Sequence, residues 1–176
     1  NFGTFETFLL QKQQFLRDQP ATCVSIGLMR GPEPVLGVVH DFCGQRIYAG
    51  LVGSGVTLNG QKITPHWADR IEQACLMTGF PAAADKSAAA LDQFVSQVRR
   101  FKKIRMIGSA ALAVAYVGCG QADVYFETGT NLWDVAAGMA IVRAAGGFLD
   151  LRPTGKHPLN FNLCAAARPE WNLLAE

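Results

Sequence analysis

The chain has 176 residues, of which 49 % are hydrophobic and 17 % charged, and its formal net charge is +2 at pH 7. This length favours a single domain with a sizeable core, and the composition excludes an intrinsically disordered chain. So small a net charge gives no electrostatic argument for nucleic acid, and no apolar run reaches the roughly 18 residues of a membrane span. We therefore expect a globular domain with neither a nucleic-acid partner nor a membrane partner.

The cysteines bear on the cellular compartment. They have neither the spacing of zinc ligands nor the density of a small disulfide scaffold. The sequence also opens without the pattern of a secretory signal peptide. Both observations predict a reducing, cytoplasmic location for the five scattered thiols of Cys23, Cys43, Cys75, Cys119 and Cys164.

The first half of the sequence divides into two parts. Residues 1–19 stay unassigned; within them, residues 5–18 predict a short amphipathic helix because aromatic residues recur on one side. The expected domain covers residues 20–176. It opens with an antiparallel meander over residues 21–64, in which Asn59-Gly60 is a strong tight-turn signal. Its four β-rich runs are at 22–29, 34–42, 46–52 and 56–63.

Helices and strands alternate in the second half. Hydrophobic periodicity and turn residues predict helices at about 85–100, at 109–117 with Ser109 as the cap, and at 134–145. Strands are predicted at 74–79, 103–108, 122–127, 147–152 and 161–167. The predicted fold class is α/β, as a mixed α/β or α+β layered sandwich.

Two acids stand at the ends of adjacent predicted elements. Glu127 closes a predicted strand, and Asp134 opens the next predicted helix across the short 128–131 loop. Unpaired amides at a helix N-terminus favour an ionised carboxylate, which suits Mg²⁺. The alternatives are ordinary: Asp134 as a helix cap, and Glu127 as a solvated acid at the end of a strand.

A second helix start offers backbone amides. Gly108, Ser109 and Ala110 lead into it, and free amides there can bind an anion or a sugar oxygen; a plain helix cap is the alternative. The predicted 134–145 helix consists largely of small residues. Gly138 costs that helix roughly 1 kcal/mol relative to alanine, which indicates a crowded contact.

Taken together, these residues resemble a known family. Residues 132–138, with Ile141-Val142 and Ala145-Gly146-Gly147, are similar to the C-terminal signature of the inositol monophosphatase family, Mg²⁺-dependent phosphatases of small sugar and polyol phosphates. The resemblance covers roughly residues 20–176. Supporting matches are Val24-Ser25-Ile26-Gly27, Gly37-Val38-Val39, Leu58-Asn59-Gly60, Thr78-Gly79-Phe80-Pro81, Gly108-Ser109-Ala110, Ala122-Asp123 and Glu127.

The resemblance implies a role for each matched residue. Asp134 would be a Mg²⁺ ligand that also touches a substrate hydroxyl, and Glu127 would bind the polyol ring. Gly108, Ser109 and Ala110 would lie at the substrate, with the Ala110 amide as a contact. The implied fold is the α/β/α/β/α sandwich of the sugar phosphatases, the implied partner is a small-molecule phosphate ester, and the implied assembly is a homodimer.

The sequence also departs from the family pattern. It contains neither the upstream Glu pair nor the D-P-x-D-G-T motif that carry the other metal carboxylates. A two-metal phosphatase needs several carboxylates, and one metal-binding Asp with one polyol-binding Glu does not supply them. We therefore expect a C-terminal portion of such an enzyme, incomplete at its N-terminus, inactive alone and without assignable catalytic residues.

The sequence leaves three functions open. The leading one is Mg²⁺-dependent hydrolysis of a phosphate monoester of inositol or a related polyol or sugar. A fructose bisphosphatase or a nucleotide-phosphate phosphatase of the same superfamily is the nearest alternative. The alternative from a different class is a non-catalytic module for polyol binding or assembly.

Overall fold

A computed structural model describes residues 3–5, 20–80 and 85–175. Its first sheet is antiparallel, with six strands that pair in chain order from β1 to β6. The strands are β1 (Gly3–Phe5), β2 (Cys23–Arg30), β3 (Glu33–Asp41), β4 (Arg46–Leu51), β5 (Gly55–Leu58) and β6 (Gln61–Ile63). The predicted meander is confirmed, including the turn at Asn59-Gly60, where both residues have a positive φ.

The second sheet is mixed. Its strands are β7 (Cys75–Thr78), β8 (Lys103–Arg105), β9 (Val124–Asn131), β10 (Phe148–Pro153) and β11 (Asn160–Ala166). Their order is β10-β11-β9-β7-β8, in which β7 runs parallel to both neighbours and the β9-β11-β10 part is antiparallel. The parallel arrangement brings the carboxyl ends of β7 and β9 to the same edge of the sheet.

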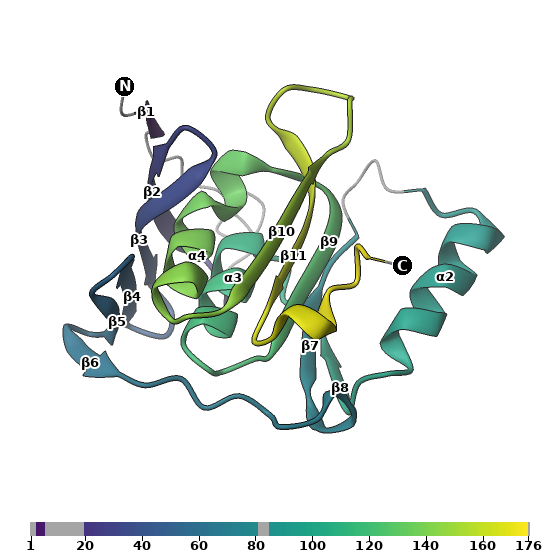
Figure 1. Cartoon of the computed structure of the whole chain (residues 1–176), viewed down its shortest axis with the longest axis horizontal. Coiled ribbons are helices and arrows are strands. Elements are labelled where there is room, and N and C mark those ends of the chain that lie inside the picture. Colours follow the sequence, from purple (N-terminus) through teal and green to yellow (C-terminus); the bar gives the residue numbers. More distant parts are fainter. Residues whose placement is uncertain (1–2, 6–19, 81–84, 176) are drawn as a thin grey trace.

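Within the described part of the chain, three α-helices complete the layers: α2 (Ala88–Val98), α3 (Ala110–Gly118) and α4 (Leu132–Ala144). Short 3-10 turns lie at Ile71–Gln73 and Pro169–Trp171. Figure 1 shows α3 and α4 between the two sheets, and α2 beyond the second sheet. The described residues therefore stack as sheet, helices, sheet and helix, which confirms the predicted layered α/β class.

A row of glycines explains how closely α4 lies on the first sheet. Gly27, Gly37 and Gly50 are register partners on β2, β3 and β4. A Cβ added at Gly27 would stand 2.8 Å from the Ala137 amide nitrogen, and one at Gly37 would overlap the Ala137 carbonyl. The absence of side chains in this row is what brings the helix backbone into contact with the sheet.

Gly138 makes the close contact that was predicted from its unfavourable helix propensity. It faces α3, and a Cβ there would stand 2.6 Å from Cβ of Val114. The two central helices therefore pack against each other as closely as α4 packs against the sheet. The small residues of α4 thus fix the position of its N-terminus relative to both sheets.

Several predicted boundaries were wrong. The 128–131 stretch is not a loop: β9 continues to Asn131, and α4 begins directly at Leu132. The helix expected at 85–100 is shorter, because the Ser87 hydroxyl caps it by accepting from the Ala90 amide. The strand expected at 103–108 ends at Arg105. Of the helix predicted over 5–18, Phe5 belongs to β1 and the rest lies outside the described residues.

The outer face of the first sheet, which points away from α4, is apolar. Ile26, Ile47 and Leu51 are each between 43 % and 45 % exposed on it. Ile26 pairs in register with Val38, and Leu51 pairs with Leu36, so the exposed side chains form a continuous surface. None of the helices in the described part of the chain is long and apolar enough to cross a membrane.

Candidate functional site

Asp134 lies in the first turn of α4, three residues after the N-cap residue Asn131. Its Oδ2 accepts a 3.3 Å hydrogen bond from the side-chain amide of Asn131, and the Asn131 backbone also hydrogen-bonds to this carboxylate. The prediction that Asp134 opens the helix was wrong, because α4 begins at Leu132, and the alternative role as its cap is excluded, because Asn131 occupies that position. The carboxylate instead reaches back toward the cap residue, as the acid of a capping box does.

The electrostatics of Asp134 also differ from the prediction. Burial raises the pKa of this carboxyl, and the two hydrogen bonds from Asn131 lower it by less. The helix-start amides therefore do not outweigh desolvation, which disfavours the charged form. A carboxylate held in such surroundings gains from a nearby cation, because a cation compensates for the water that it has lost.

Glu127 lies on β9 at the edge where β7 ends. Its Oε2 accepts a 3.0 Å hydrogen bond from the Tyr125 hydroxyl. The same oxygen lies above Gly79, where an added Cβ would stand 2.7 Å away. Burial raises the pKa of Glu127, and the negative charge of Asp134 raises it further, so this acid is not a freely solvated one.

The start of α3 uses its serine internally. Ser109 is 3 % exposed, and its Oγ accepts from the Leu112 amide at 3.2 Å, so the predicted cap is confirmed. Gly108 has φ +73, a conformation suited to glycine, and leads into the helix. Ala110 is the first helical residue, and an amide at this position has no partner within its own helix.

Cys23 lies beside the start of α3. Its Sγ is 3.7 Å from Ser109 Oγ, and its pKa is raised to about 11, chiefly by burial and to a smaller extent by the charges of Asp41 and Asp134. The charge of Asp134 also contributes to the raised pKa of Glu127, so these two acids lie in one electrostatic neighbourhood.

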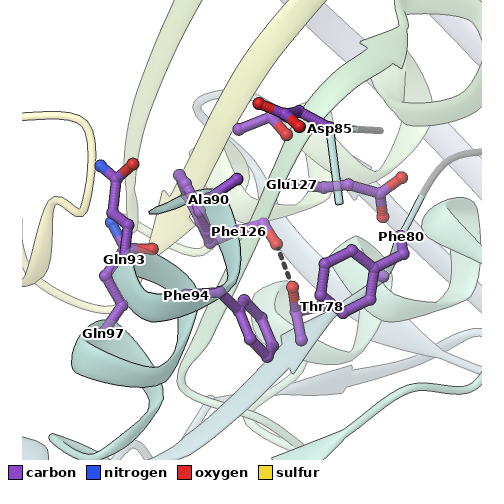
Figure 2. Close-up of a pocket in the computed structure, with 11 residues that line it drawn as sticks. Thr78, Phe80, Asp85, Ala90, Gln93, Phe94, Gln97, Phe126 and Glu127 are labelled. Carbon is purple, nitrogen blue, oxygen red and sulfur yellow. Dashed lines mark hydrogen bonds between the residues drawn. The ribbon is translucent and has the colours of Figure 1, made fainter. Parts of the chain in front are cut away.

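A cavity of about 260 Å³ adjoins Glu127. It lies between α2 and the ends of β7 and β9, and Figure 2 shows Phe80, Asp85 and Glu127 around it. Phe80 is 41 % exposed, and its ring is 4.7 Å from that of Phe94. The Thr78 hydroxyl donates to the Phe126 carbonyl and is not free for a ligand. The lining residues are Thr78, Gly79, Phe80, Asp85, Ala90, Gln93, Phe94, Gln97, Phe126, Glu127 and Thr128.

The potential metal-binding side chains of the described residues fit part of a metal site. Across residues 3–5, 20–80 and 85–175, no group of three or more His, Cys, Asp or Glu side chains could hold a metal ion. Mg²⁺ usually takes one or two protein carboxylates, keeps several waters and binds substrate phosphate. The partly buried Asp134 carboxylate fits one such ligand.

Sequence reasoning missed the residues that hold the two acids. Tyr125 alternates with Glu127 on one face of β9, so period-two spacing could have pointed to it. Asn131 precedes Asp134 by three residues, which is capping-box spacing. Cys23 and Asn160 gave no local signal, because their contacts with Ser109 and Asn131 are long-range.

The fold and site define a layered α/β protein with two partly buried carboxylates at the edge of its second sheet. The family model of the inositol monophosphatase family matches residues 13–176. The chain belongs to the inositol monophosphatase family, a family of phosphatases.

Individual relatives support the same family assignment. The chain is 40 % identical over 136 residues to a protein of Xylella fastidiosa named Nus factor SuhB, covering 77 % of this chain and 50 % of that one. It is 33 % identical over 175 residues to inositol-1-monophosphatase of Synechocystis, covering 89 % and 60 %. The chain thus spans about half to three fifths of the length of these relatives.

Solved structures give the same fold. SuhB of Mycobacterium tuberculosis superposes with a TM-score of 0.76 at 30 % identity, covering 88 % of this chain and 62 % of that chain. Inositol monophosphatase from Anabaena gives a TM-score of 0.78 at 28 % identity, covering 94 % and 66 %. Both are similar to this chain over most of its length.

Proposed function

We propose that this chain forms part of a Mg²⁺-dependent phosphatase that hydrolyses a phosphate monoester of inositol or a related polyol. One observation carries the proposal: Glu127 and Asp134 lie in one electrostatic neighbourhood, and burial raises the pKa of each. Keeping two acids close together in a desolvated site is costly unless a cation or hydroxyl ligand binds there. Family membership gives this pair a chemical context.

Each site residue has a proposed role. Asp134 contributes a carboxylate to the metal and an oxygen to a substrate hydroxyl. Glu127 accepts from a second hydroxyl, since the Tyr125 bond orients its carboxylate toward the cavity edge. The Ala110 amide, with Gly108 before it, contacts the anionic end of the ester, and Ser109 keeps this helix start in place.

Mg²⁺, when bound, would polarise the phosphate and lower the pKa of the attacking water. The described residues of this chain supply a single ligand for that chemistry, together with the groups that bind the polyol. We therefore propose that residues 20–176 are the C-terminal portion of the catalytic unit and that the 176 residues are inactive alone. The cytoplasm and a homodimer are the proposed location and assembly.

The cavity beside Glu127 favours a polyol over a second phosphate. Among the described residues, its lining contains two carboxylates, those of Asp85 and Glu127, and no Lys, Arg or His. An anionic group placed there would be repelled, while hydroxyl groups find an acceptor in Glu127 and apolar ring faces find Phe80. This supports a monoester of a neutral alcohol over fructose bisphosphate or a nucleotide carrying a second phosphate.

One observation favours a non-catalytic module as the second candidate. The described residues lack a three-acid metal cluster, so the chain by itself could act as a polyol-binding or assembly domain. The phosphatase and the non-catalytic module differ in whether they bind Mg²⁺. Calorimetric titration with MgCl₂ of an active protein that contains this chain should give binding that Asp134→Asn abolishes, whereas a module would show no binding.

Turnover completes the test. In that active protein, Asp134→Asn should abolish hydrolysis of inositol monophosphate without unfolding it, and Glu127→Gln should raise KM about tenfold or more, because a hydrogen bond to a charged acceptor is lost. The 176-residue chain alone should show no hydrolysis. An unaffected rate for Asp134→Asn would exclude the metal role, and turnover by the chain alone would contradict its proposed inactivity.

A further inference from the structure

We propose that Asn160 is a positioning residue that sets the orientation of Asp134 through Asn131. Asn160 begins β11, whereas Asp134 is in α4, so the effect passes between two elements. The inference rests on the proposed function in one respect, namely that Asp134 is the carboxylate that binds the metal. Its structural part, the orientation of Asp134, is testable without any catalysis.

Two side-chain amides connect the strand to the acid. Nδ2 of Asn160 donates to Oδ1 of Asn131 at 3.0 Å, and Nδ2 of Asn131 donates to Oδ2 of Asp134 at 3.3 Å. The register explains the first contact, because Asn160 and Asn131 are directly paired residues of β11 and β9. The sheet therefore places the Asn131 amide, and that amide reaches the acid one helical turn away.

Two backbone carbonyls fix the orientation of the Asn160 amide. The carbonyls of Gly129 and Thr130 can only accept, and they lie 2.8 Å and 3.3 Å from Nδ2 of Asn160. The NH₂ group of Asn160 therefore faces β9, and its Oδ1 faces the other way, where it accepts from the Thr154 hydroxyl at 2.7 Å. The Thr154 oxygen in turn accepts from the Lys156 amide at 3.3 Å.

The same logic orients Asn131. Because Oδ1 of Asn131 accepts from Asn160, its NH₂ group is the one that faces Asp134. A flipped Asn131 amide would set a carbonyl oxygen against the carboxylate and would place two donors against each other at Asn160. The backbone carbonyls at the end of β9 thus determine, through two amides, that a donor meets Asp134.

Asn160 has further bonds that would serve a purely structural role. Its Nδ2 also lies 2.8 Å from the Gly129 carbonyl and 3.3 Å from the Thr130 carbonyl, so its two hydrogens serve three acceptors, with one hydrogen shared, and hold the end of β9. Asn162 offers a matched comparison, since its Oδ1 accepts from the Gly129 amide at 3.0 Å and holds the same stretch from β11. No hydrogen bond among the described residues joins Asn162 to Asn131 or Asp134.

The test compares Asn160→Asp with Asn162→Asp in the full 176-residue chain. Both changes are nearly isosteric and add one negative charge beside the end of β9. Asn162→Asp keeps the oxygen that accepts from Gly129, whereas Asn160→Asp keeps the acceptor for Thr154 and loses every donor. NMR three-bond couplings that report χ1 of Asp134 give the orientation directly, and amide exchange of the folded core confirms that each variant is folded.

We expect one χ1 rotamer for Asp134 in the unaltered chain and in Asn162→Asp, and averaged rotamers in Asn160→Asp. Thr154→Val removes only the donor to Oδ1 of Asn160 and leaves the Gly129 and Thr130 carbonyls to hold its NH₂ group, so this second control should keep one rotamer in a chain that stays folded. A single unchanged rotamer in Asn160→Asp would overturn the proposal. Equal averaging in Asn160→Asp and Asn162→Asp would overturn it as well, because charge or strand loosening would then be the cause.

A titration with MgCl₂ of the same variants, made in the active protein that contains this chain, separates this inference from the proposed function, because the described residues alone supply a single proposed ligand. Outer groups that orient a metal ligand typically change metal affinity about 10–100-fold. The half-saturating MgCl₂ concentration should rise by that factor in Asn160→Asp and stay constant in Asn162→Asp. If MgCl₂ leaves the Asp134 resonances of the unaltered chain unmoved, the metal role fails, whereas the rotamer comparison still decides whether Asn160 positions Asp134.

Discussion

The hydroxyl of Tyr125 donates to Oε2 of Glu127, two residues further along β9, across 3.0 Å. Tyr125 is fully buried, and its partner lies at the edge of the sheet above Gly79. A strand directs residues two apart to the same face, so the core anchors the tyrosine while the acid reaches the cavity. The hydrogen bond is the one contribution that lowers the pKa of Glu127 against burial and the charge of Asp134.

Tyr125→Phe should therefore raise the pKa of Glu127 further, because only the raising contributions remain. At neutral pH it should also cost about 1–3 kcal/mol of unfolding free energy, since a partly buried carboxylate oxygen loses its donor. Urea unfolding and an NMR titration of Glu127 measure the two effects. Tyr48→Phe is the matched control: its hydroxyl donates to Gln121 at 3.2 Å, so it should leave the pKa of Glu127 unchanged.

Glu127→Gln should stabilise the chain at neutral pH. Burial raises the pKa of Glu127 in the fold, so the folded chain binds more protons than the unfolded chain between the unfolded pKa of about 4.3 and the raised value. Unfolding free energy accordingly falls as pH rises through that window, and stays lower above it. Thermal unfolding at a series of pH values should show a shallower fall for the variant.

The same argument applies to Asp134→Asn, because burial also raises the pKa of Asp134. In the double variant, Glu127→Gln with Asp134→Asn, the unfolding free energy should lose most of the decrease that these two acids cause between about pH 4 and neutral pH. If Glu127→Gln and Asp134→Asn both keep the slope of the unaltered chain, the two carboxyls are not desolvated as described.

Gly37→Ala should destabilise the fold by about 1–3 kcal/mol or more, because the added methyl group has no room. Its Cβ would overlap the Ala137 carbonyl, which belongs to the helix backbone and cannot swing aside. Ala49→Val enlarges a side chain on the opposite face of the same sheet and should cost little. Urea unfolding of both variants gives the comparison, and equal costs would contradict the close contact of α4 with the sheet.

The apolar outer face of the first sheet should bind a hydrophobic dye. Ile26→Thr combined with Ile47→Thr should lower the fluorescence of the dye ANS while leaving stability within about 1 kcal/mol, because both side chains are about 45 % exposed. The control replaces Leu91 and Val95, which are 41 % and 40 % exposed on α2, with glutamine. Equal losses of fluorescence in both pairs would show that no continuous surface exists on the sheet.

The local chemistry of the sequence determined much of the fold. Four β-rich runs and Asn59-Gly60 predicted the meander, since a two-residue turn fixes the pairing of adjacent strands. Ser109 predicted its own helix start, because a cap is a contact between residues three apart. Boundaries failed where tertiary packing took over: the 128–131 stretch pairs with β11 and so continues β9 instead of forming a loop.

By itself, the sequence determined that Glu127 and Asp134 were the acids to examine and that they belonged to a phosphatase-like signature. Only the tertiary structure decided their surroundings. Burial, and not the helix start, dominates the pKa of Asp134, because desolvation depends on what packs around a group and not on its neighbours in the chain. Likewise, Asn160 meets Asn131 only because β11 pairs with β9, a long-range contact that no local pattern encodes.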